Sequence, residues 1–145
     1  MKTIKLLFLF LAVLVPQTTS NVYALGDDVS PEATEEVRQV AAKEKLGSEP
    51  GSVVLYAKGL CCPSCAIGVR KMIGKLDFVD RGRFNKGVDL DTKTQLVTVA
   101  IGDGEKPDLN SLSQAVWSAG YDPVRAYKLK NGKLLSEALA AKAVK

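Results

Sequence analysis

Residues 52–76 read SVVLYAKGLCCPSCAIGVRKMIGKL, and this stretch decides the fold. Its first seven residues are rich in β-branched side chains and alternate as a half-buried strand does. Gly59 breaks that strand, and Pro63 suits the first turn of a helix. Apolar side chains then recur at spacings of three and four, at positions 66, 69, 73 and 76. The stretch predicts a strand, a loop with three cysteines, and an amphipathic helix that begins at those cysteines.

Downstream, the pattern continues with two strands, a helix and a final strand. Residues 88–90 and 96–101 are strand-like and are separated by a polar segment suited to a hairpin turn. A second amphipathic helix begins at about Asp108 and is stopped by Gly120, and residues 124–127 form a last short strand. The order predicts an α+β, ferredoxin-like βαββαβ sandwich, in which an antiparallel four-stranded sheet carries two helices on one face.

The beginning of the chain predicts a signal peptide, residues 1–24. Lys2 and Lys5 precede the apolar run of residues 6–15, and small residues allow cleavage after Ala24. That run is too short to cross a hydrocarbon core, which requires about 20 residues. We therefore expect a periplasmic or secreted protein.

Residues 25–51 and 128–145 flank the expected domain, residues 52–127. The first flank predicts an acidic linker or a short helix that begins at Ser30. Its thin apolar stripe consists of Ala33, Val37, Val40 and Ala41. The second flank is a basic tail, in which Asn131 and Gly132 form a turn before leucines and alanines spaced for a helix. This tail could contact an anionic membrane or a transporter, or pack as a helix on the sheet edge.

Charge and composition exclude several functions. The 20 basic side chains fall to 18 without the two signal-peptide lysines, against 16 acidic ones, and this net charge of +2 is too small to indicate nucleic acid as a partner. The chain has three cysteines and no histidine. Without histidine, the usual general base is missing, which argues against an ordinary catalytic triad. A mixed Cys/His zinc site and histidine-ligated haem are excluded.

The cysteines form a local cluster, since all lie within residues 61–65. Cys62 is in the loop and Cys65 in the first helical turn, where free backbone N–H groups and the helix dipole stabilise a thiolate. Lys58 could add to that stabilisation. Two thiolates on a loop suit a soft ion of low coordination number, Cu(I) or Hg(II). A closed zinc site requires four ligands, so Zn(II) is only a third candidate.

The segment Gly59-Leu60-Cys61-Cys62-Pro63-Ser64-Cys65 resembles the Gly-Met-Thr-Cys-x-x-Cys loop of the heavy-metal-associated domain family, which includes copper chaperones and periplasmic mercury-binding proteins. The resemblance extends over residues 52–127 and implies the same βαββαβ fold. It implies that Cys62 and Cys65 are the metal ligands, with Gly59, Lys58 and Tyr121 around them. It also implies a monomer that passes its ion to a metal transporter or to another carrier with a cysteine pair.

This sequence departs from the family pattern at three places. Leu60 replaces the usual methionine and keeps its apolar role. Cys61 replaces the usual threonine, and it is either an additional ligand or a small, partly buried residue. The stretch of residues 77–87 is longer than the family's link and carries three basic side chains. It is either a basic docking surface or a solvated loop.

A thiol–disulfide oxidoreductase is the alternative from a different class. Cys-Pro-Ser-Cys at the start of a helix in an exported protein also resembles the active sites of thioredoxins and glutaredoxins. Those folds place a proline directly before a strand that faces the dithiol, whereas Pro107 here precedes a helix start. We therefore favour metal binding over redox catalysis, and we expect no enzymatic activity.

Overall fold

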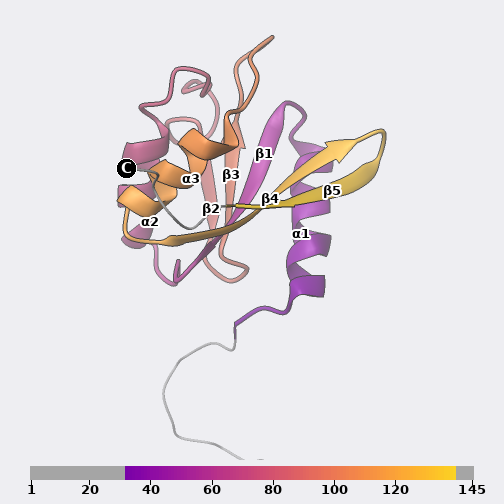
Figure 1. Cartoon of the computed structure of the whole chain (residues 1–145), viewed down its shortest axis with the longest axis horizontal. Helices are drawn as coiled ribbons and strands as arrows, with labels where there is room; N and C mark the ends of the chain where they lie inside the picture. Colours follow the sequence, from indigo (N-terminus) through magenta and orange to yellow (C-terminus); the bar gives the residue numbers. More distant parts are fainter. Residues whose placement is uncertain (1–31, 140–145) are drawn as a thin grey trace, which may run out of the picture.

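The computed structural model describes residues 32–139 of the 145-residue chain (Figure 1). These residues form an α+β fold with a five-stranded antiparallel sheet in the order β2-β3-β1-β4-β5. The helices are α1 (Glu35–Ser48), α2 (Cys65–Ile73) and α3 (Leu109–Ser118), and the strands are β1 (Ser52–Lys58), β2 (Val88–Asp91), β3 (Leu96–Ala100), β4 (Asp122–Lys130) and β5 (Lys133–Ala138). None of these helices is long and apolar enough to span a membrane. The expected signal peptide lies outside the described residues.

β1 is the central strand and has buried residues on both of its faces. Val53, Leu55 and Ala57 belong to the core cluster that α2 and α3 cover. Val54 and Tyr56 belong to a second cluster under α1. In Figure 1, α1 lies on the other side of the sheet from α2 and α3. The expectation of a half-buried strand is therefore wrong, because α1 covers the face that was expected to meet water.

The middle of the chain forms the expected elements. β2 and β3 pair as an antiparallel hairpin. Asp108 caps α3 by accepting a hydrogen bond of 3.0 Å from the N–H of Asn110. Gly120, at φ 92°, stops the chain from continuing as a helix, because side-chain-bearing residues rarely adopt that conformation. β4 then begins at Asp122, two residues earlier than expected.

α1 forms a helix within the flank where a linker or a short helix was expected. Thr34 is its N-cap, and the Thr34 hydroxyl accepts a hydrogen bond from the N–H of Val37. The expected apolar stripe is wrong, since Val37 is 51% exposed and Val40 is 68% exposed. The buried face is instead formed by Arg38, Ala42 and Leu46. An arginine forms the N-terminal part of this face, so hydrophobic spacing did not identify it.

β4 and β5 form a hairpin where the sequence predicted a helical tail. Asn131 has φ 51° and Gly132 has φ 73°. Two consecutive residues with positive φ are typical of a type I′ turn, whose twist matches that of paired strands. The turn pairs Lys130 with Lys133. The helix expectation is wrong for Lys133–Ala138, and the sheet has five strands instead of four, because the turn directs this segment back along β4.

The long stretch of residues 77–87 is fastened to the protein by its arginines. Arg83 donates to the Glu49 carboxylate at 2.8 Å and to the Pro50 carbonyl at 3.0 Å. Arg81 donates to the Gly74 carbonyl at 2.6 Å. These two side chains stabilise the connection between α2 and β2.

Candidate functional site

The loop between β1 and α2 is anchored at both ends. Leu60 is fully buried, which confirms its expected apolar role. Cys65 is the first residue of α2 and packs, partly buried, against the same core cluster. Between them, the N–H of Cys65 donates to the Cys62 carbonyl at 3.1 Å and closes a tight turn. The turn brings the three cysteines close together at the start of α2.

The three sulfur atoms lie close together. Cys62 and Cys65 form a disulfide, with their Cα atoms 5.3 Å apart. Cys61 is a free thiol and is exposed, so the alternative that made it a partly buried residue is wrong. All three Sγ atoms lie within 4.8 Å of one another. Reduction of the disulfide would therefore leave three thiols in one place.

Ser64 is a site residue that the sequence reasoning missed. It occupies the N-cap position of α2, but its side chain makes no capping hydrogen bond. Its hydroxyl instead lies 3.2 Å from Sγ of Cys62. A hydroxyl can donate to a thiolate, and the helix dipole favours negative charge at this end. The spacing of Ser64 two residues after Cys62 was the signal that could have identified this contact.

Gly59 and Tyr121 lie side by side at the start of the cysteine loop. Gly59 has φ 91°, and a Cβ atom at this position would lie 3.8 Å from Cδ1 of Tyr121. The Tyr121 ring is partly buried against the main core, and its N–H donates to the Val116 carbonyl at 3.2 Å. The end of α3 therefore places an aromatic ring against the backbone that leads into the cysteines.

Lys58 points away from α2. By strand alternation it shares the α1 face of β1 with Tyr56, and it is exposed. The pKa of Glu32 is lowered, mainly by the hydrogen bond from Tyr56 and in smaller part by the charges of Lys58 and Arg38. The positive charge of Lys58 thus acts on the carboxylate beside α1, on the face opposite the helix that begins at the cysteines.

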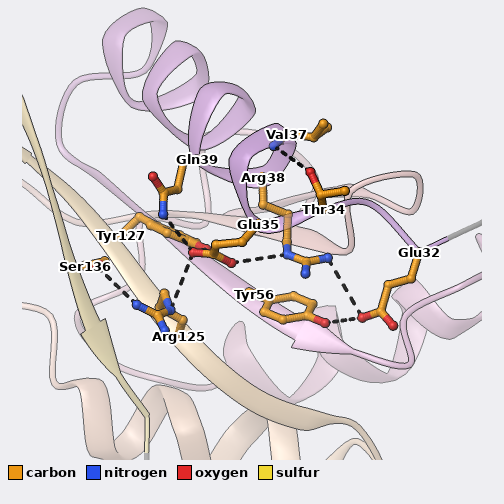
Figure 2. A network of polar contacts seen from close by, with 10 residues as sticks. All are labelled: Glu32, Thr34, Glu35, Val37, Arg38, Gln39, Tyr56, Arg125, Tyr127 and Ser136. Atoms are coloured by element: carbon orange, nitrogen blue, oxygen red, sulfur yellow. Dashed lines mark hydrogen bonds and ion pairs between the residues drawn. The ribbon is translucent and has the colours of Figure 1, made fainter.

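A second polar cluster, the α1 network, lies between α1 and the sheet (Figure 2). The Arg38 guanidinium faces the carboxylates of Glu32 and Glu35, at 3.9 Å and 3.6 Å. The Tyr56 hydroxyl donates to Glu32, and the Tyr127 hydroxyl donates to Glu35 at 3.0 Å. Each carboxylate therefore meets both a cation and a hydroxyl, an arrangement that holds α1 on the sheet.

The pKa shifts in this network follow from burial and pairing. Burial, helped by the hydrogen bond to Glu32, raises the pKa of Tyr56 to about 12. Burial also raises the pKa of Tyr127, with help from its hydrogen bond to Glu35. Burial would raise the pKa of Glu35, but hydrogen bonds from Gln39 and Tyr127 and nearby arginines outweigh it and lower the pKa. The network is therefore most stable with neutral tyrosines and ionised glutamates.

Comparison with known proteins gave no significant match to a family model, a curated protein or a solved structure. The function is therefore inferred from the chemistry of the site. Of the residues expected there, the three cysteines converge and Gly59 lies near the Tyr121 ring, whereas the charge of Lys58 acts on Glu32 beside α1.

Proposed function

We propose that this protein is a carrier of a soft metal ion, Cu(I) or Hg(II), which the reduced thiolates of Cys62 and Cys65 bind. The observation that supports this most directly is the convergence of the sulfur atoms within 4.8 Å at the start of α2. Thiolates are the preferred ligands of soft ions, and a helix N-terminus favours the thiolate form. Zn(II) ranks behind these two ions, because three sulfurs leave a tetrahedral site one ligand short.

The fold supports the resemblance to heavy-metal-associated domains. We propose that β1-α2-β2-β3-α3-β4 is a ferredoxin-like unit, to which α1 and β5 are additions. Its strands follow the order β2-β3-β1-β4, and α2 and α3 share the core cluster on one face. This connection of two split βαβ halves is the ferredoxin-like arrangement.

The proposed carrier works by ligand exchange with a partner. Cys61, Pro63 and Ser64 are exposed, so a second protein can reach the site. A partner's thiolates can bind the ion before Cys62 and Cys65 release it, and rapid transfer is then compatible with tight binding. The partner would be a membrane metal transporter or another carrier with a cysteine pair. The carrier itself would be a periplasmic or secreted monomer, and its basic C-terminal end could contact the membrane.

The disulfide favours a second candidate, a thiol–disulfide oxidoreductase. An oxidised Cys62–Cys65 pair at a helix start is also the resting state of such an enzyme. The same bond prevents metal binding, because both sulfurs are then unavailable as thiolates. The two functions are therefore separated by what the reduced protein does.

Metal titration of the reduced protein tests the carrier. We expect native mass spectrometry to detect one Cu(I) or Hg(II) per chain, and we expect Cys62→Ser and Cys65→Ser each to abolish tight binding against a competing chelator. The oxidised wild-type protein is the matched control and should bind neither ion. Wild-type affinity in either serine variant would refute the ligand assignment.

A further inference from the structure

A carrier that uses two thiolates leaves the third sulfur without a role. Building on the proposed function, we propose that Cys61 completes a three-thiolate site that also takes a trivalent metalloid, arsenic(III) or antimony(III), as a further cargo. Three features of the molecule support this: the spacing of the sulfurs, the anchoring of the loop, and the charge around it.

The sulfur spacing suits three-fold coordination. Metal–thiolate bonds are about 2.3 Å long, which places the sulfurs of a trigonal site about 4 Å apart and those of a pyramidal site somewhat closer. The three Sγ atoms already lie within 4.8 Å of one another. Two of these atoms are joined in the Cys62–Cys65 disulfide. After reduction these two must move apart and Cys61 must turn toward them, changes that staggered side-chain rotamers allow.

The loop anchors provide both stability and freedom of movement. Leu60 is fully buried and Cys65 packs against the core, so the backbone on either side of the cluster is held. Cys61 is exposed, so its side chain can turn without displacing core residues. The third sulfur can thus join a bound ion while the fold stays unchanged.

Charge balance favours a trivalent ion. Three thiolates around Cu(I) carry a net charge of −2 and around Hg(II) a net charge of −1, whereas around a trivalent ion they are neutral. Cys62 and Cys65 are half-buried, and uncompensated charge in such a position is costly. By strand alternation Lys58 shares the face of β1 that holds Tyr56, and its charge acts on Glu32. Within residues 32–139 the side-chain hydrogen-bond partner of the cluster is neutral Ser64. The partial positive charge of the helix end offsets only about half an elementary charge.

The chemistry proceeds in two balanced steps. A dithiol reductant first gives two electrons and two protons to the Cys62–Cys65 disulfide and becomes a disulfide itself. Arsenous acid, As(OH)₃, then reacts with the three thiols. Three As–S bonds form, three As–O bonds break and three water molecules leave, without any change in the oxidation state of arsenic.

Arsenite titration of the reduced full chain tests this proposal, with thiol alkylation and mass spectrometry as the readout. We expect one arsenic per chain and protection of all three thiols in the loaded protein. Cys61→Ser should weaken arsenite binding by at least about tenfold, since even outer partners of a metal site contribute that much. The same variant should keep its Cu(I) affinity within about threefold, because two thiolates are sufficient for that ion.

Two results would overturn the three-thiolate site. One is alkylation of Cys61 at the same rate in loaded and unloaded protein, and the other is equal arsenite affinity of the wild type and Cys61→Ser. Either result leaves Cu(I) binding by Cys62 and Cys65 intact, so it would refute this inference alone. Loss of all metal binding by reduced wild-type protein would instead refute the carrier function.

Discussion

The guanidinium carbon of Arg38 lies 3.9 Å from the centroid of the Tyr56 ring, in the layer between α1 and the sheet. Arg38 is only 8% exposed, and its Nε and Nη1 atoms have ion-pair contacts but no hydrogen bond of normal length. A ring face attracts a desolvated cation, and this attraction partly compensates for the missing hydrogen bonds. α1 is thus attached to the sheet through a buried charge as well as through apolar packing.

We predict that Arg38→Ala destabilises the protein by about 3 kcal/mol, because it removes the buried cation that faces Glu32 and Glu35 and leaves a cavity over Tyr56, although Glu35 keeps its ion pair with Arg125. Arg38→Met should cost less, since it keeps most of the volume. The free energy of unfolding in urea measures both. Lys43→Ala, at an exposed position of the same helix, is the control and should change stability by less than about 0.5 kcal/mol. An equal effect of Arg38→Ala and Lys43→Ala would contradict a stabilising role for the buried guanidinium.

The α1 network predicts that stability falls at both ends of the pH scale. The pKa values of Glu32 and Glu35 are lowered from 4.5, so their contribution is present above pH 4.5 and is lost as pH falls through the folded-state values. The pKa of Tyr56 is raised from 10.0 to about 12, so its contribution is present below pH 10.0 and is lost as pH rises toward 12. Unfolding free energies across pH should show both declines. In Glu35→Gln the acid decline should be shallower, and an unchanged slope would contradict the assignment.

Two glycines with similar backbone angles provide a matched pair for steric effects. Gly87 has φ 81°, and a Cβ atom there would lie 2.4 Å from Cγ1 of Val79. Gly104 has φ 79° and has open space around it. We predict that Gly104→Ala costs about 1 to 2 kcal/mol, the usual penalty of a left-handed conformation. Gly87→Ala should cost at least about 2 kcal/mol more, because Val79 must move. Thermal unfolding measures both losses of stability. If the two variants lose equal stability, the stretch before β2 adjusts to the added methyl group and the prediction is wrong.

We predict negligible disulfide reductase or isomerase activity. Redox catalysis requires a readily exchanged disulfide and a surface that accepts unfolded chains, and the short loop of residues 59–64 fits transfer of an ion better. The measurement is reactivation of a scrambled disulfide-bonded substrate, with a thioredoxin-like enzyme as positive control and Cys62→Ser as negative control. Turnover comparable with the positive control would make the oxidoreductase the correct function, whatever metal the protein also binds.

The sequence predicted the elements whose signals are local. Residues 52–76 contain a strand pattern, a breaking glycine and a helical repeat, and these gave β1, the cysteine loop and α2. The face of β1 that holds Tyr56 was not predicted to be covered, because its cover is α1, whose buried face contains Arg38. A search for apolar residues at helical spacing treats Arg38 as a solvent-facing position, so it cannot identify the buried face of α1.

The last strand shows the opposite difficulty. The leucines after Gly132 have a spacing that a helix would accept, and the pair Asn131-Gly132 is a strong hairpin signal. The Asn131-Gly132 turn is thus the signal that predicts β5, and it outweighs the helical spacing of the leucines. At the site, the cysteine positions were evident from the sequence, whereas the exposure of Cys61 and the contact between Cys62 and Ser64 depend on how the loop folds back.

The disulfide between Cys62 and Cys65 spans a sequence separation of only three residues. A cross-link restrains the unfolded chain in proportion to the logarithm of the loop that it closes, so such a short loop contributes much less than one between distant elements. The sheet and the three helices are held by their two apolar clusters, and these contain neither Cys61 nor Cys62. Breaking this bond should therefore lower the free energy of unfolding by only roughly 2 kcal/mol, less than half of the effect of a 100-residue loop. The protein can meet oxidising and reducing surroundings in turn without unfolding, while the sulfurs of Cys62 and Cys65 change between blocked and available ligands.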